Sequence, residues 1–424
     1  MTRVKYLIIG NSAGAIGAAE AIRQVDTQGA LAIVSAEPYP AYSRVRISEA
    51  LAKKLAAEDI LFRPADFYET NNIQAFFGKK AERLDIEGHS VKLDDGSEIK
   101  WRKLLLATGG LPIVPPIEGG ESTGVFTFTT YDDVTAIDKY LDKVKEAVVI
   151  GGGLIGVSAS EALTRRGIRV SIVEMKDRVL NAVLDEEASA LEEAAMSQAG
   201  IEIITGCTAD EITSDKNNAV DGVRLGDGRA IPCQMVVIAI GVKPRTELVK
   251  DTGIEVNRGI VVDEKMATSA ADVYACGDVA ESYDFVYDQN RLTPIWPNAY
   301  TGGRVAGFNM AGETARYGGG TSMNTMKYFG VDIVSAGITV PPDGSYKTII
   351  NRGNGVYRKV IIKNGCVAGL LFTGDIEKSG IILGLMRDRV DVSDYADILV
   401  EEGFGLACLP DEIWKLRLAT EAQL

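Results

Sequence analysis

Two glycine-rich turns, each between an apolar run and a stretch of small residues, carry the clearest chemical pattern in the chain. The stretch VVIGGGLIG places Gly151, Gly153 and Gly156 at G-x-G-x-x-G spacing. In such a turn the first glycine makes a tight bend, the second lets the backbone approach a pyrophosphate, and the third packs helix on strand. Leu154 and Ile155 open the helix, and the N–H groups at a helix N-terminus attract phosphate. The spacing therefore predicts a dinucleotide-binding turn.

Glu174 indicates which dinucleotide this turn binds. It ends the run RVSIVE, 18 residues after Gly156. A carboxylate there accepts hydrogen bonds from an adenosine ribose and repels a 2′-phosphate, at about 4 kcal/mol for like charges ~4 Å apart near a protein surface. Lys176 and Arg178 follow closely and offset part of this repulsion. We therefore expect NAD(H) rather than NADP(H).

The turn near the start of the chain, YLIIGNSAGAIG, departs from the same spacing. Counted from Gly10, Ser12 and Ala15 stand where the second and third glycines belong, with Gly14 between them. Serine allows moderate backbone approach, and alanine is an accepted third residue. Glu37, just after the strand-like run LAIVS, is the candidate ribose acid. These residues alone leave two interpretations open, a nucleotide turn and a packed helix start.

Strands alternating with helices must position both turns. We expect strands over 5–10, 30–35, 103–110, 146–153, 168–174, 201–206 and 235–241, and helices over 14–25, 154–166 and 185–199. A hairpin-like meander is expected around 82–106. This alternation is typical of parallel α/β units, which occur twice. After the glycine-rich segment 318–323, alternating runs predict antiparallel strands and two closing helices.

The composition argues against several other classes of protein. The 424 residues carry a formal net charge of −14, which disfavours nucleic acid and anionic membranes as main partners. His89 is the one histidine, so most histidine-based catalysis is disfavoured. The five cysteines form no C-x-x-C, C-x-C or C-x4-C pair, and no metal site is expected. No signal peptide or membrane span is recognised, so a cytoplasmic protein is expected.

Four further stretches carry a family resemblance. VYACGD contains Gly277 and Asp278, LLLATGGLP contains Thr108 and Gly109, VVIAIGVKPRTEL contains Gly241, and WPNAYTGGRVAGFNMAG contains Pro297 and Ala299. In this order they resemble the pyridine nucleotide–disulfide oxidoreductase superfamily. The resemblance implies a glutathione-reductase-like α/β fold with two Rossmann-like dinucleotide-binding domains and a C-terminal α+β domain. It also implies that Asp278 binds the FAD ribitol and that the helix from Pro297 points its N-terminus at the flavin.

The resemblance extends to domains and to whole sets of cofactor-binding residues. It implies an FAD-binding domain at 1–112 and 245–318, an NAD-binding domain at 113–244, and a C-terminal interface domain at 319–424. The residues implied to bind FAD are Gly10, Ser12, Gly14, Ala15, Glu37, Arg44, Ala81, Thr108, Gly109, Gly277, Asp278, Pro297 and Ala299. Those implied to bind NAD(H) are Gly151, Gly153, Leu154, Ile155, Gly156, Glu174 and Gly241.

The loop PAYSRVRIS indicates the branch of the family. Ser43 stands where coenzyme A disulfide reductases and NADH oxidases carry a cysteine, and a hydroxyl cannot form a sulfenate or mixed disulfide. The loop and the run 369–399 resemble rubredoxin reductases and the flavin part of NADH nitrite reductases, in which the arginine, here Arg44, lies along the FAD phosphates. Many relatives carry a lysine and a glutamate near the flavin, where this chain has Glu49 and Ser158.

The expected function is an FAD-dependent oxidoreductase that moves electrons between NADH and a protein carrier such as rubredoxin, ferredoxin or an iron–sulfur subunit. One alternative is the FAD- and NAD-binding subunit of an anaerobic dehydrogenase of the aldehyde or phenylglyoxylate oxidoreductase type. Others are an NADH oxidase and a flavin sensor without turnover. The basic residues Arg44, Arg46, Lys53, Lys54 and Arg63 suggest either a solvated face or a dock for a small acidic carrier. The C-terminal domain is expected to support a homo- or hetero-oligomer.

Overall fold

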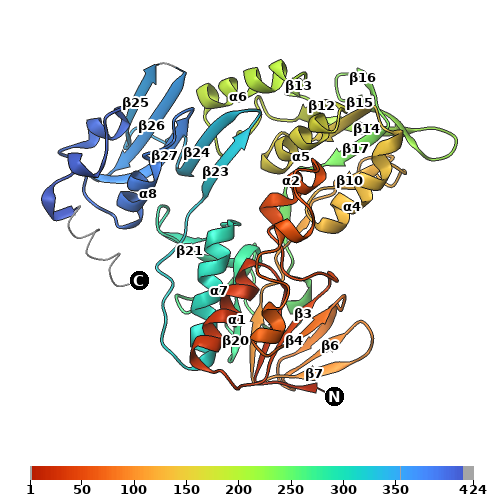
Figure 1. Cartoon of the computed structure of the whole chain (residues 1–424), viewed down its shortest axis with the longest axis vertical. Coiled ribbons are helices and arrows are strands. Elements are labelled where there is room, and N and C mark those ends of the chain that lie inside the picture. The colour runs from red at the N-terminus through yellow and green to blue at the C-terminus, as the bar shows by residue number, and fades with distance from the viewer. Residues whose placement is uncertain (1, 354, 414–424) are drawn as a thin grey trace. The chain divides into compact units, whose positions relative to one another are not determined.

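The computed structural model describes residues 2–353 and 355–413 (Figure 1). The chain divides into two compact units, one of residues 1–175 with 207–321 and the other of residues 176–206 with 322–424. Both nucleotide-type turns, at Gly10 and at Gly151, lie in the first unit.

The first parallel sheet has the strand order β20-β8-β2-β3-β4. Its strands are β2 (Tyr6–Ile9), β3 (Leu31–Ser35), β4 (Ile73–Phe77), β8 (Lys103–Leu106) and β20 (Val273–Ala275). Every residue of β2 and β3 is buried, as expected for parallel strands covered on both faces. Because β20 pairs with β8, segments about 170 residues apart in sequence complete one sheet.

Helices α1 (Ala13–Val25) and α7 (Trp296–Ala311) lie side by side in this unit (Figure 1). Glycines let their backbones touch. A Cβ added to Gly303 would overlap with the carbonyl oxygen of Gly14, and one added to Gly307 would overlap with that of Ala18. The small residues of the first turn are therefore required for helix packing, whatever they bind. Of the two interpretations left open by the sequence, the tightly packed helix start is confirmed, and nucleotide binding by this turn stays a prediction.

The second parallel sheet in the first unit has the order β10-β17-β11-β12. Its elements are β10 (Val125–Thr127), α4 (Tyr131–Tyr140), β11 (Glu146–Ile150), α5 (Leu154–Arg165), β12 (Arg169–Glu174) and β17 (Met235–Ile238). Helix α4 begins with a capping box: the Thr130 hydroxyl accepts from the Asp133 N–H, and the Asp133 carboxylate accepts from the Thr130 N–H.

The remaining elements of the first unit are short. The meander forms β1 (Thr2–Arg3), β5 (Ala81–Asp85), β6 (Ser90–Leu93) and β7 (Glu98–Lys100), and a second small sheet has β14 (Ala209–Ser214), β15 (Val220–Leu225) and β16 (Ala230–Pro232). Strand β9 (Gly110–Pro112) pairs with β18 (Val242–Pro244), and β19 (Ile260–Val261) with β21 (Ala280–Asp284), which also pairs with β22 (Gln289–Arg291). Helices α2 (Ile47–Leu51) and α3 (Phe67–Thr70) complete the unit, with 3-10 turns at Arg44–Arg46, Glu58–Ile60, Leu141–Lys143, Glu247–Val249 and Gly277–Val279.

The second unit is built on an antiparallel sheet of order β23-β24-β27-β26-β25. Its elements are α6 (Glu186–Gln198), β13 (Glu202–Thr205), β23 (Met323–Tyr328), β24 (Val331–Gly337), β25 (Lys347–Gly353), β26 (Val356–Lys363), β27 (Cys366–Thr373) and α8 (Ser379–Arg387). The Asp185 carboxylate caps α6 and also accepts from Tyr357 (2.6 Å) and from the buried Lys359 ammonium (2.7 Å). These bonds tie α6 to β26.

The predicted strands, helices and fold class are confirmed, with one difference. Several expected strands included the glycines that follow them; the observed strands β8, β11 and β17 end earlier, because the chain turns there. Of the two helices expected to close the chain, α8 is present and residues 411–413 are again helical; between them lie 3-10 turns at Ala396–Val400 and Leu406–Cys408. Residues 414–424 lie outside the described part.

Candidate cofactor-binding site

The first turn joins the end of β2 to α1. Gly10 has φ +119°, and a Cβ there would overlap with the carbonyl oxygen of Ala107, which follows β8. Ser12 is the N-cap of α1, but its side chain makes no capping hydrogen bond. Among the residues that the structure describes, no side chain accepts from the first N–H groups of this 13-residue helix, so this end of α1 fits a phosphate.

The ends of β2, β8 and β20 lie at the same edge of the first sheet. Thr108 and Gly109 follow β8, and Gly277 and Asp278 follow β20, which is paired with β8. In open parallel sheets, ligands bind outside the carboxyl ends of the strands. The half-buried Asp278 has a pKa raised by burial and lowered in part by the nearby Arg44 guanidinium.

The start of α7 reaches the same place. Pro297 is exposed in its first turn, and Ala299 is buried. A Cβ on Gly14 would lie 3.2 Å from the Ala299 carbonyl oxygen, and one on Gly277 would lie 3.3 Å from the Ala299 Cβ. The structure therefore brings together the turn residues, the Asp278 motif and the N-terminus of α7. Ala81 lies elsewhere, on β5 of the small meander sheet.

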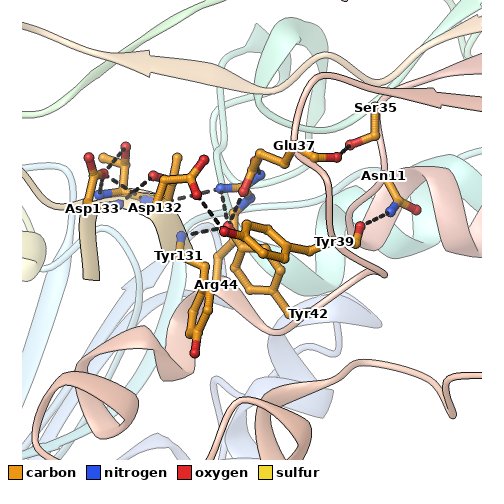
Figure 2. Close-up of polar contacts among 11 residues, drawn as sticks. Asn11, Ser35, Glu37, Tyr39, Tyr42, Arg44, Tyr131, Asp132 and Asp133 are labelled. Atoms are coloured by element: carbon orange, nitrogen blue, oxygen red, sulfur yellow. Dashed lines mark hydrogen bonds and ion pairs between the residues drawn. The ribbon is translucent and has the colours of Figure 1, made fainter. Parts of the chain in front are cut away.

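Glu37 and Arg44 form the polar cluster drawn in Figure 2. The Glu37 carboxylate accepts hydrogen bonds from the Arg44 guanidinium and from the Tyr42 hydroxyl. Arg44 also donates to Tyr42 (3.1 Å) and to the carbonyl oxygen of Thr129 (3.0 Å). Burial lowers the pKa of Arg44, but Tyr42, Glu37 and Asp278 outweigh it, so the pKa is raised and the group stays charged.

Tyr42 links this cluster to the second nucleotide fold. Its hydroxyl accepts from the N–H of Tyr131, the first residue of α4, at 2.9 Å. Tyr39 adds a second link, because its hydroxyl donates to Asp132 at 2.6 Å and its ring packs edge-on against that of Tyr131. Figure 2 shows Tyr39, Tyr42 and Tyr131 gathered beside Glu37 and Arg44. Sequence reasoning missed both tyrosine links, since no spacing rule pairs residues about 90 positions apart.

In the second turn the three glycines have three different surroundings. Gly151 (φ +110°) follows β11, and a Cβ there would lie 2.5 Å from the Ala239 carbonyl oxygen. A Cβ on Gly156 would overlap with the carbonyl oxygen of Gly151. A Cβ on Gly153, the N-cap of α5, would meet nothing within 4 Å. Open space at the middle glycine is what an approaching pyrophosphate needs, so the turn fits a dinucleotide.

Glu174 lies where the sequence predicted it, at the end of β12. Its side chain is buried, and its Oε2 accepts from the Gly152 N–H at 2.6 Å. The carboxylate therefore helps to hold the glycine turn in shape. Leu154 and Ile155 open α5, and Gly241 (φ +118°) accepts from the Ile113 N–H through its carbonyl oxygen at 2.9 Å.

Glu49 and Ser158 stand on α2 and α5, two helices that pack together. Glu49 forms an ion pair with Arg46 (3.4 Å), and both side chains are about 40% exposed. A pairing of this kind, between partly exposed charges, contributes little to stability. Ser43 is half-buried, and its N–H donates to the Ile60 carbonyl oxygen at 2.7 Å.

Four residues of the basic cluster make local ion pairs. The pairs are Arg44 with Glu37, Arg46 with Glu49, Lys53 with Asp138 and Arg63 with Glu20. Lys54 is exposed. The carboxylates offset most of the positive charge, so the cluster has a small net charge.

Within residues 2–353 and 355–413, no group of three or more His, Cys, Asp or Glu side chains is arranged to hold a metal ion. In the same part of the chain, no helix combines the length and apolar character needed to cross a membrane.

Two family models match consecutive parts of the chain. Residues 4–320 match the family model for pyridine nucleotide-disulphide oxidoreductases, and residues 323–390 match that for the rubredoxin NAD+ reductase C-terminal domain. The epsilon subunit of an NADH-dependent phenylglyoxylate dehydrogenase from Aromatoleum evansii is 32% identical over 92% of this chain and 93% of its own length. An NADH-rubredoxin oxidoreductase from Clostridium acetobutylicum is 32% identical over 80% of this chain and 82% of its own.

Two further relatives match nearly the whole of this chain but cover different shares of their own length. A nitrite reductase from Bacillus subtilis is 29% identical over 94% of this chain, which spans about half (49%) of that protein. The solved structure of an NAD-dependent persulfide reductase from A. fulgidus superposes with a TM-score of 0.86 at 27% identity, over 99% of this chain and 84% of its own. The chain therefore belongs to the pyridine nucleotide-disulphide oxidoreductase family, and it is a flavoprotein oxidoreductase that uses FAD and NAD(H).

Proposed function

We propose that this protein moves electrons between NADH and a protein electron carrier, such as rubredoxin, ferredoxin or an iron–sulfur subunit. The observation that carries the proposal is the absence of a reactive thiol where disulfide chemistry would need one. Ser43 occupies the loop beside Arg44, and a hydroxyl cannot take part in thiol–disulfide exchange. Reducing equivalents would then leave through the flavin rather than through a thiol.

Two cysteines of the first unit, Cys276 and Cys233, support the same conclusion. Cys276 precedes the Gly277–Asp278 pair, is 1% exposed, and has a pKa raised to about 12 by burial. Cys233 is also buried, and burial raises its pKa to about 12. Thiols with such pKa values stay protonated near neutral pH, so they are poor nucleophiles. Both pack in the interior.

We propose the first fold as the FAD site and the second as the NAD(H) site. The first domain would comprise residues 1–112 and 245–318, the second 113–244, and the C-terminal interface domain 319–424. The shared sheet of β8 and β20 supports the joining of the two FAD segments. Bound FAD supplies a group that takes up a hydride equivalent from NADH and passes electrons on singly.

The chain's own residues would bind and orient the two cofactors. The N-termini of α1 and α5 would face the phosphates, Arg44 would add a positive charge at the first site, and Asp278 would accept hydrogen bonds from hydroxyl groups. Glu174 would select a nucleotide that has a free ribose 2′-hydroxyl. No side-chain acid or base is required, because hydride and electron transfer depend on position.

A second candidate function is the FAD- and NAD-binding subunit of a larger dehydrogenase. The relative from Aromatoleum evansii favours it, because that protein is a subunit of such an enzyme and the likeness covers nearly its whole length. The proposed interface role of the C-terminal domain is compatible with this assignment.

The decisive test is anaerobic stopped-flow reduction of the purified flavoprotein by NADH and by NADPH, followed by a panel of acceptors. We expect NADH to bleach the flavin faster than NADPH, and rubredoxin or ferredoxin to reoxidise it. Reoxidation only by a co-purifying cluster-bearing subunit would favour the second candidate. Rapid turnover with oxygen alone would indicate an oxidase, and no bleaching by NADH would indicate a sensor; both results would refute the proposal.

A further inference from the structure

Arg245 is a half-buried arginine that was not among the cofactor-binding residues predicted from the sequence. It directly follows β18, and its backbone is fixed to the turn after β8. Its N–H donates to the Gly109 carbonyl oxygen, and its own carbonyl oxygen accepts from the Thr108 hydroxyl, both at 2.9 Å. The side chain therefore starts from the residues expected to contact FAD.

The guanidinium of Arg245 is incompletely satisfied. Its Nε is buried and has no hydrogen-bond partner among the residues that the structure describes. A buried polar atom of a charged group without a partner costs free energy, and such groups in native structures commonly await a ligand or water. The unpartnered atom indicates that something outside the chain completes this site.

The charges around Arg245 indicate what that partner is. Burial and the neighbouring Arg44 both lower the pKa of Arg245, while Glu247 and Glu37 partly oppose them. Glu37 is already bound by Arg44 and Tyr42. The guanidinium groups of Arg245 and Arg44 therefore repel each other. Because the Glu37 carboxylate is already engaged, an added anion would relieve this repulsion.

We propose that Arg245 is a second guanidinium ligand for the pyrophosphate of FAD, acting together with Arg44. The proposal rests on the placement of FAD in the first fold. Arginine suits this role, because it stays charged when buried and its fork of donors matches phosphate oxygens. Arg245 would therefore help to retain the cofactor.

Because of this role, one substitution of Arg245 should change the stability of the flavin-free chain and its affinity for FAD in opposite directions. Replacing Arg245 by methionine removes a half-buried charge with an unsatisfied Nε, and its repulsion with Arg44, so the flavin-free chain should melt at a higher temperature, by about 1–3 °C. The same change removes a phosphate ligand, so FAD should bind about 10- to 100-fold more weakly. If Arg245 only supported the fold, replacing it would lower both the melting temperature of the flavin-free chain and the FAD affinity.

The experiment measures FAD binding and melting of the full chain after flavin removal, for the wild type, Arg245→Met, Arg245→Lys and Lys243→Met. Lys243 is an exposed residue on the same strand and serves as the matched control. FAD affinity comes from quenching of flavin fluorescence at two salt concentrations, and retention from the flavin absorbance that survives gel filtration.

We expect Arg245→Met to lose affinity and salt dependence, Arg245→Lys to keep part of both, and Lys243→Met to match the wild type. Equal FAD affinity in Arg245→Met and wild type would overturn the inference while leaving the proposed function intact. A flavin-free Arg245→Met chain that melts below the wild type would also overturn it. Failure of the wild type itself to bind FAD would instead refute the placement of FAD.

Discussion

Replacing Glu174 by glutamine should relax the choice between NADH and NADPH without damaging the turn. The Glu174 carboxylate is 9% exposed and accepts from the Gly152 N–H at 2.6 Å. A glutamine amide oxygen can still accept that bond, so the variant removes the charge alone. Like charges ~4 Å apart near a protein surface repel by about 4 kcal/mol, which is a factor of about 10³. Discrimination against NADPH should fall by up to that factor.

Glu174→Ala tests the second role of this residue, which is to hold the glycine turn through the Gly152 N–H. The alanine variant loses both the charge and the acceptor for Gly152. A hydrogen bond to a charged group contributes about 1.5–3 kcal/mol, so the variant should also melt at a lower temperature and react more slowly with NADH. The glutamine variant should keep both properties close to those of the wild type.

The assay is anaerobic stopped-flow bleaching of the flavin over a range of NADH and NADPH concentrations, read as the ratio of the two second-order rate constants. Asp177→Asn is the control, since this acid lies three residues further on with its side chain 77% exposed. A ratio in Glu174→Gln within about threefold of the wild type would refute the electrostatic argument, because it would correspond to less than ~1 kcal/mol.

Three other changes follow from the packing and the ion pairs. Tyr42→Phe removes a hydroxyl that forms hydrogen bonds with three partners, at a cost of about 1–3 kcal/mol in stability. We therefore expect the temperatures of thermal unfolding and of flavin release to fall together. An unchanged temperature of flavin release would contradict the linking role of Tyr42. Gly303→Ala should lower the melting temperature or abolish soluble expression, because its Cβ would overlap with helix α1, whereas Gly318→Ala, with open space around it, should not. Asp185→Ala removes the carboxylate partner of the 8% exposed Lys359 ammonium, which keeps its hydrogen bond to the Thr339 carbonyl oxygen, and should cost about 3–5 kcal/mol near pH 7 in urea unfolding. Burial raises the pKa of Asp185, but hydrogen bonds from Lys359, Tyr357 and the Ala188 N–H outweigh burial, so the pKa is lowered from its ordinary value of 3.8. The extra stability of the wild type is therefore present above pH 3.8 and is lost as the pH falls through the lowered pKa. Extra stability that persists well below the lowered pKa would be inconsistent with this assignment.

The elements and the turns were predictable because their causes are local. Alternation of apolar residues specifies strands and helices, and the spacing of Gly151, Gly153 and Gly156 specifies a turn whose geometry the structure confirms. The residues expected to bind FAD and NAD(H) remain predictions, although most of them gather at the ends of the strands.

The parts that sequence reasoning missed depend on contacts between distant segments. No local pattern reveals that Gly14 touches Gly303, that Tyr42 caps Tyr131, or that Arg245 lies near Arg44. These contacts follow from the crossovers of the fold, which bring together segments separated by up to about 290 residues. The sequence left the role of the basic cluster open for a similar reason, because Asp138 and Glu20, which pair with Lys53 and Arg63, lie 85 and 43 positions away from them.

The split first sheet also sets an order of events during synthesis. Strand β8 ends at Leu106, but its partner β20 begins at Val273 and the helix that packs on α1 ends at Ala311. At about 5–20 residues per second, a ribosome needs roughly 8–33 s to make the intervening 166 residues. The segment from β11 to β12 is contiguous and can pair during that interval. A newly made chain therefore holds the apolar edge of β8 unpaired for many seconds, and truncation before residue 273 leaves that edge open to aggregation.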